Sequence, residues 1–141
     1  MINQTKLLFF TCLFSLLFCS LAQALQPAVI GGIRNGLALG VIAEEPIASN
    51  TSLRFGAELN TGNQPIILFF GGKFYLTNIS GKIPMSFGLQ AVGYSGNRST
   101  DLGLGISLIF SRPFNVNPLF FEFGVDVAGS GHLQAQAGYF F

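Results

Sequence analysis

The sequence predicts an all-β protein: a small, closed, antiparallel up-and-down transmembrane barrel of about eight strands with short turns, preceded by a signal peptide. Three observations lead to this prediction. Apolar residues alternate with small or polar ones along successive segments, which is the period of two residues typical of β-strands. Clusters of Gly, Asn, Ser and Pro separate the segments. Half of the 141 residues are hydrophobic and 9% are charged, against roughly 25% in an ordinary soluble domain.

The N-terminus has the three parts of a secretory signal peptide. Lys6 supplies a positive charge, residues 7–21 form an uncharged apolar stretch, and Ala22-Gln23-Ala24 has the small-x-small pattern that a signal peptidase recognises. We therefore expect residues 1–24 to be removed, with Ala22 and Ala24 as the recognised residues. The mature domain would be residues 25–141.

The predicted cleavage has one consequence for the composition, and the N-terminal segment has one alternative interpretation. Cys12 and Cys19 both precede the predicted site, so the mature chain would contain no cysteine. The alternative is an N-terminal membrane anchor. Gln23, Gln26 and Pro27 argue against it, because a spanning helix needs about 20 predominantly apolar residues.

Six segments of the mature chain show the alternation clearly. In residues 101–111, for example, Leu102, Leu104 and Ile106 share one face, while Gly103 and Gly105 lie on the other. The six predicted strands are residues 51–60, 66–76, 83–94, 101–111, 118–128 and 132–141. The turn clusters between or after them are residues 61–65, 78–82, 95–99, 113–117 and 129–131, short enough to form hairpins.

The first part of the mature chain allows two interpretations. Residues 28–43 form either one long strand or two short strands joined at Asn35-Gly36, which is a type I′ hairpin signal. Glu44-Glu45-Pro46 is expected to end the segment in either case. The total is therefore seven or eight strands.

The distribution of charge over the two strand faces indicates which face meets lipid. The apolar face carries no charge in any of the six segments, and an Arg or Lys at the middle of a membrane costs about 2–4 kcal/mol. The other face has too few charges for bulk water but suits a narrow, partly polar bore. A sheet in hydrocarbon must also close, because it cannot leave an unpaired edge. A secreted soluble barrel that binds an apolar ligand remains the alternative.

The charges on the second face predict a polar network inside the barrel. Its members are Arg54, Glu58, Lys73, Glu122 and Asp126, with Arg34 and Asp101 near strand ends. Buried charges must be paired, so we expect these side chains to form ion pairs that fill the bore. An ion pathway through so small a bore is the less favoured interpretation.

The composition argues against a nucleic-acid-binding surface and against a metal site. With 7 basic and 6 acidic residues the chain lacks the positive surface of a nucleic-acid-binding protein. One histidine and no mature cysteine do not supply the usual ligands of a metal site. We therefore predict no cofactor, no metal and no nucleic-acid partner.

The last strand ends Tyr139-Phe140-Phe141, and here the chain resembles the small outer-membrane β-barrels of Gram-negative bacteria, of about eight strands. In that family, alternating aromatic residues ending in Phe are the signature that the barrel-assembly machinery recognises. Tyr139 and Phe141 occupy its positions, while Gln136 stands where the family often has Gly. The resemblance implies an outer-membrane location, contact with the lipid bilayer and lipopolysaccharide, and periplasmic chaperones as partners during biogenesis. It also implies an even strand number, which favours the hairpin at Asn35-Gly36.

The predicted function is that of an integral outer-membrane barrel with a structural or envelope-interaction role and no catalysis. The alternative from a different class is a lipid A-modifying acyl hydrolase, because some small barrels of this kind use Ser, His and an acid. Ser130 and His132 are adjacent to a strand that carries Glu122 and Asp126, but the His-x-Ser motif of those enzymes is missing.

Overall fold

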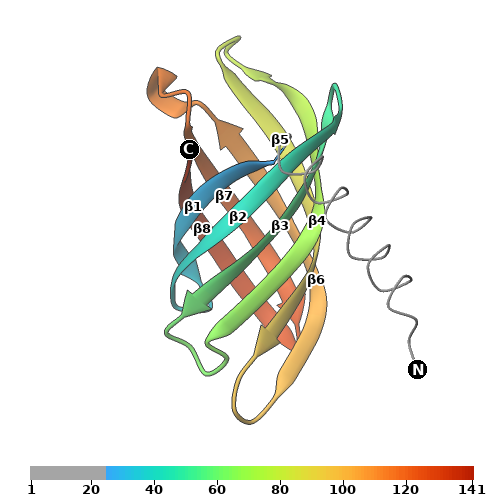
Figure 1. The fold of residues 1–141 in the computed structure, drawn as a ribbon, viewed down its shortest axis with the longest axis vertical. Coiled ribbons are helices and arrows are strands. Elements are labelled where there is room, and N and C mark those ends of the chain that lie inside the picture. The colour runs from blue at the N-terminus through green and yellow to red at the C-terminus, as the bar shows by residue number, and fades with distance from the viewer. Residues whose placement is uncertain (1–24) are drawn as a thin grey trace, which may run out of the picture.

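The computed structural model describes residues 25–141, which form a closed barrel of eight antiparallel strands (Figure 1). Each strand pairs with the next one in the chain, and β1 pairs with β8 to close the barrel. The strands are β1 (Gln26–Arg34), β2 (Leu37–Ala48), β3 (Thr51–Asn60), β4 (Ile66–Ile79), β5 (Ile83–Ser95), β6 (Thr100–Ser111), β7 (Leu119–Ala128) and β8 (Ser130–Phe140). The predicted signal peptide, with Ala22 and Ala24, lies outside the described residues.

The structure confirms the hairpin interpretation of the first segment, and therefore eight strands. β1 and β2 pair from Gln26 with Glu44 to Ile33 with Leu37, and Asn35-Gly36 forms the turn between them. Both turn residues have positive φ, 55° and 117°, as a type I′ turn requires. Asn and Gly are the residues that adopt this conformation at least cost.

The prediction that Glu44-Glu45-Pro46 ends the second strand is wrong. β2 continues to Ala48 and stays paired with β3, where Glu44 lies opposite Arg54. Proline is tolerated at this point because β1 stops pairing at Glu44, so Pro46 lies where one edge of β2 is open. The pairing register also shifts between Pro46 and Ala48.

Two turns are shorter than the sequence suggests. β4 continues through Asn78 and Ile79, which pair with Pro84 and Ile83, so the β4–β5 turn contains Ser80 and Gly81 in positive φ conformations. β8 begins at Ser130, and Gly129 alone separates it from β7. The β6–β7 connection, at the opposite end of the barrel from the β7–β8 turn, is the longest between the described strands and contains a single 3-10 turn, η1 (Pro113–Asn115).

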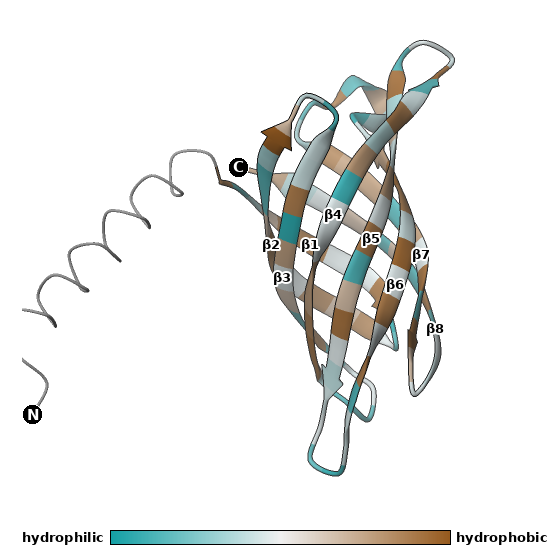
Figure 2. Cartoon of the chain, turned by 90° about the vertical axis from the view of Figure 1, so that its right-hand side faces the viewer, coloured by the Kyte–Doolittle hydropathy of each residue, from teal (hydrophilic) through white to brown (hydrophobic). Residues whose placement is uncertain are grey.

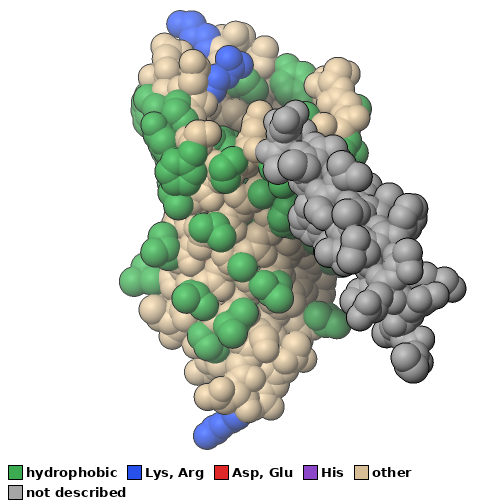
Figure 3. Space-filling model, viewed as in Figure 1, with side chains coloured by type: hydrophobic (Ala, Val, Ile, Leu, Met, Phe, Trp, Pro, Cys, Tyr) green, Lys and Arg blue, Asp and Glu red, His purple; other side chains and the backbone are tan. Residues whose placement is uncertain are grey.

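The two strand faces separate as the alternation predicts. The inner face buries an apolar cluster that includes Ile30, Ile67, Phe69, Ile109 and Phe120 together with most of the charged strand residues. Hydrophobic and hydrophilic residues alternate along the strands (Figure 2), the exposed strand residues are mostly large and apolar, and in the view of Figure 3 Lys and Arg side chains are visible at the two ends. Among residues 25–141, no helix is long and apolar enough to span a membrane.

Candidate functional site: the charged interior of the barrel

The interior contains two clusters of ion pairs, and the first is centred on Arg34. Its guanidinium donates from Nη1 to Glu58 Oε1 and from Nε to Asp126 Oδ2, each at 2.7 Å. All three side chains are fully buried. Because Arg34 is on β1, Glu58 on β3 and Asp126 on β7, this one side chain connects three parts of the wall across the bore.

Uncharged groups add hydrogen bonds to the carboxylates of the Arg34 cluster, in which Arg34 Nη2 and Asp126 Oδ1 have no hydrogen-bond partner. The Tyr94 hydroxyl donates to Asp126 Oδ2 at 2.6 Å, and the Gln136 amide donates to Glu58 Oε2. The Arg34 guanidinium also lies 4.8 Å from the centre of the Phe69 ring. The two carboxylates, which share one cation, thus receive additional donors from β5 and β8.

The second cluster is centred on Arg54. Its guanidinium makes two parallel hydrogen bonds to Glu122, at 3.1 and 2.8 Å, which is the bidentate geometry of a strong Arg–carboxylate pair. Arg54 Nε lies 2.9 Å from Glu44 Oε1, and Lys73 Nζ lies 3.0 Å from Glu44 Oε2. Ser107 donates to Glu122 Oε1 at 2.7 Å. This cluster therefore connects β2, β3, β4, β6 and β7.

Phenylalanine rings line the bore beside the cations of the Arg54 cluster. Arg54 lies 5.9 Å from the centre of the Phe120 ring, and Lys73 Nζ lies 5.8 Å from that of Phe140. Phe120 and Phe140 contact each other with ring centres 5.1 Å apart. These aromatic faces supply cation–π contacts inside the barrel, so charged and apolar side chains together fill its width.

Glycines on the inner face make room for these large side chains. A Cβ added to Gly105 would overlap the carboxylate of Asp126, and one added to Gly138 would overlap the ring of Phe120. The role of glycine here is close packing within a narrow bore.

All five residues of the predicted network lie in the interior. Glu58 and Asp126 belong to the Arg34 cluster, whereas Arg54, Lys73 and Glu122 belong to the Arg54 cluster. Arg34, expected only near a strand end, is the centre of its cluster. Asp101 lies apart, at the entrance near the β5–β6 turn, where it accepts a hydrogen bond from Gln64 Nε2 at 2.8 Å.

Glu44 is the charged member that the sequence prediction missed. It was assigned to a strand break, but it lies on the inner face of β2, buried between Arg54 and Lys73. The alternation contained the signal: Ala38, Gly40 and Ile42 precede it at steps of two residues.

Ser130 and His132 lie beside each other, and the nearby Asp126 of β7 has other partners. Ser130 Oγ lies 3.3 Å from His132 Nε2 in an exposed position beside the turn. Asp126, which pairs with His132 in the strand register, directs its carboxylate to Arg34 and Tyr94. The His132 ring instead packs on the Tyr94 ring, with centres 4.6 Å apart.

Tyr139 and Phe141, on either side of the inward-facing Phe140, lie on the outer surface. Tyr139 pairs with Val29 and Leu119 and faces outward, next to Phe141 at 6.3 Å between ring centres. Within residues 25–141, no group of three or more His, Cys, Asp or Glu side chains is placed to hold a metal ion. Comparisons with known protein families, curated proteins and solved structures find no match for this chain.

Proposed function

We propose that residues 25–141 form an integral outer-membrane protein, a non-catalytic barrel whose role is structural or an interaction with other envelope components. The observation that supports this most strongly is the inverted distribution of side chains. Most of the charged residues of the strands are buried inside, and large apolar residues cover most of the outside, with Leu102 81% and Leu133 75% exposed. Soluble proteins rarely expose continuous apolar surfaces of this extent.

The interior supports a stabilising role for the ion pairs. The Arg34 and Arg54 clusters connect strands on opposite sides of the bore with hydrogen-bonded charges, and the phenylalanines pack against them. A closed barrel also satisfies the backbone of every strand, which hydrocarbon demands. The lipid bilayer and lipopolysaccharide are the partners that this outer surface would contact.

The proposal is tested by fractionating cells of a Gram-negative host that express the full chain. We expect the protein in the outer-membrane fraction, extractable with detergent and not with alkaline buffer. Unheated samples should migrate differently from boiled samples on SDS gels, because a closed barrel resists unfolding by SDS. Recovery from the periplasm without detergent would support the soluble alternative and would contradict the proposal.

The exposed C-terminal aromatic residues provide a second test. If Tyr139 and Phe141 form the assembly signal, Phe141→Ser should lower the fraction of heat-modifiable protein in cells. Phe114, which is similarly exposed in the β6–β7 connection, is the matched control. Equal assembly of Phe141→Ser and Phe114→Ser would exclude a specific role for the C-terminus.

A further inference from the structure

The aromatic residues of the outer face gather toward one end of the barrel. We call this end, where β1 begins and β8 ends, the terminal rim. Phe74 pairs with Thr51, the first residue of β3, and Phe110 pairs with Phe121 close to the start of β7. The outward aromatic residues in the terminal half of their strands include Phe74, Phe87, Phe110, Phe121, Phe123 and Tyr139. Phe55 and Phe70 pair with each other nearer the middle.

The opposite end has a different outer surface. Its outward positions carry aliphatic residues close to the turns, such as Leu37, Leu59, Leu102 and Leu133. Transmembrane barrels usually have an aromatic girdle at each of the two membrane interfaces. The described strands of this barrel carry one such belt, at the terminal rim.

The β6–β7 connection adds a further aromatic ring to this belt. Arg112, Phe114 and Asn115 all have left-handed backbone conformations, with φ of 54°, 56° and 62°. Such conformations cost bulky residues free energy and persist where the surroundings impose them. Here they place Phe114, 82% exposed, edge-on to Phe121 with ring centres 6.2 Å apart.

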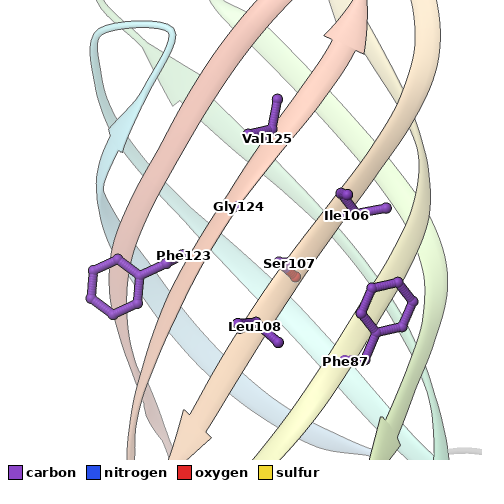
Figure 4. A pocket seen from close by; sticks show the side chains of 7 residues that line it. All are labelled: Phe87, Ile106, Ser107, Leu108, Phe123, Gly124 and Val125. Carbon is purple, nitrogen blue, oxygen red and sulfur yellow. The ribbon is translucent and has the colours of Figure 1, made fainter.

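A shallow apolar hollow lies in the same part of the wall (Figure 4). Phe87, Leu108 and Phe123 rise around it, and Ser107 and Gly124 form its floor. The Ser107 hydroxyl is bonded to Glu122 inside the barrel, so the hollow presents almost no polar group to the outside. Its shape and chemistry suit a segment of a lipid acyl chain.

Two exposed cations lie beyond the belt, in connections at the same end of the barrel. Lys82 is at the tip of the β4–β5 hairpin, and Arg112 follows β6; both connections are at the end of the barrel that carries the C-terminus (Figure 1). Neither takes part in an ion pair within residues 25–141, where the five ion pairs use Arg34, Arg54 and Lys73. The aromatic rings of the belt match the ester layer of a glycerophospholipid leaflet. The two cations, farther toward the end of the barrel, match its phosphate layer.

We propose that the terminal rim binds the headgroup layer of a glycerophospholipid leaflet. The rings of the belt lie at the level of the glycerol esters, and Lys82 and Arg112 contact the phosphates. The opposite, aliphatic end makes no such contact, so the two ends of the barrel suit leaflets of different composition. This inference rests on the proposed membrane location and specifies the lipid that one end recognises.

The sequence contains no Trp, so a single introduced Trp reports on one position. Phe114→Trp probes the terminal rim, and Leu102→Trp, which replaces an equally exposed residue, probes the opposite end. The mature chain is refolded into vesicles of phosphatidylcholine and phosphatidylglycerol in which one lipid or the other is brominated. Quenching then measures which lipid surrounds each Trp.

We expect the lipid around Phe114→Trp to be enriched about fivefold in anionic phosphatidylglycerol, the preference that one nearby cation provides. Leu102→Trp should show no preference. Adding Lys82→Gln and Arg112→Gln should abolish the enrichment, whereas Arg98→Gln, in the β5–β6 turn at the opposite end, should leave it unchanged. Equal enrichment at the two ends, or its loss in Arg98→Gln, would overturn the inference. Absence of quenching at both positions would instead show that the barrel does not insert, and would overturn the proposed function with it.

Discussion

The two ion-pair clusters of the interior each pair two buried carboxylates with cations, but they use different numbers of cations. In the Arg34 cluster one cation serves two carboxylates, those of Glu58 and Asp126. In the Arg54 cluster two cations, Arg54 and Lys73, serve Glu44 and Glu122. The side chains of the first cluster are completely buried, whereas Lys73 is 15% exposed.

This difference shows where the barrel depends on a single side chain. Removing a charge from water costs several kcal/mol unless a partner and further hydrogen bonds compensate. The Arg34 cluster has no second cation among its ion pairs, and Tyr94 and Gln136 supply the remaining donors. The Arg54 cluster retains a cation if either Arg54 or Lys73 is lost.

Arg34→Met should therefore be the most destabilising interior substitution. It leaves Glu58 and Asp126 buried without a cation, which we expect to cost about 3–5 kcal/mol in the free energy of unfolding. Urea titration of the protein folded in vesicles measures this value, with Arg98→Met in an exposed turn as the control. A loss no larger than that of the control would contradict the interpretation of Arg34 as the central residue of its cluster.

Arg54→Met should cost less, about 2–3 kcal/mol, because Lys73 still pairs with Glu44 and Ser107 still donates to Glu122. The same titration compares the two variants directly. If Arg54→Met is the more destabilising of the two, the number of cations is not what distinguishes the clusters.

The two clusters can also be compared by removing an uncharged hydrogen-bond donor from each, which leaves every charge in place. Tyr94→Phe removes the hydroxyl that donates to Asp126, and Ser107→Ala removes the hydroxyl that donates to Glu122. Hydrogen bonds to charged groups contribute about 1.5–3 kcal/mol. We expect Tyr94→Phe near the upper end and Ser107→Ala near the lower end, because Glu122 keeps two bonds from Arg54. If the two substitutions lowered the free energy of unfolding equally, the carboxylates of the two clusters would depend equally on their neutral donors, which would contradict this comparison.

Lys73→Met should have the smallest effect, about 0–1 kcal/mol, as expected for a partly exposed ion pair. Glu44 keeps its contact with Arg54 at 2.9 Å. The expected order of unfolding free energies would fail if Lys73→Met destabilised the barrel as much as Arg54→Met.

Most of the architecture could be predicted because side-chain alternation has the same period as the strand. Leu102, Leu104 and Ile106 fall on the outer face as predicted, and Asn35-Gly36 forms the predicted turn. The alternation also assigns Glu58 and Asp126 to the inner face. Local pattern thus determines which residues face inward.

Alternation does not determine which inward residues meet. Glu58 and Asp126 are 68 positions apart, and their connection through Arg34 depends on the curvature of the closed wall. Glu44 was missed because a proline two residues later resembles a strand end, whereas the open edge of β2 tolerates it. The left-handed backbone at Phe114 has no signal in the sequence, because residues of this type rarely adopt it.

The central claim is that the apolar outer face meets lipid, and Ile106→Arg tests it most directly. Ile106 faces outward near the middle of β6, beside the hollow of the wall. If this face is in hydrocarbon, the substitution should lower the free energy of unfolding in vesicles by about 2–4 kcal/mol. Asn97→Arg, in the exposed β5–β6 turn, should change it by less than about 0.5 kcal/mol. Equal, negligible effects of the two substitutions would mean that water surrounds the barrel, and would contradict the account.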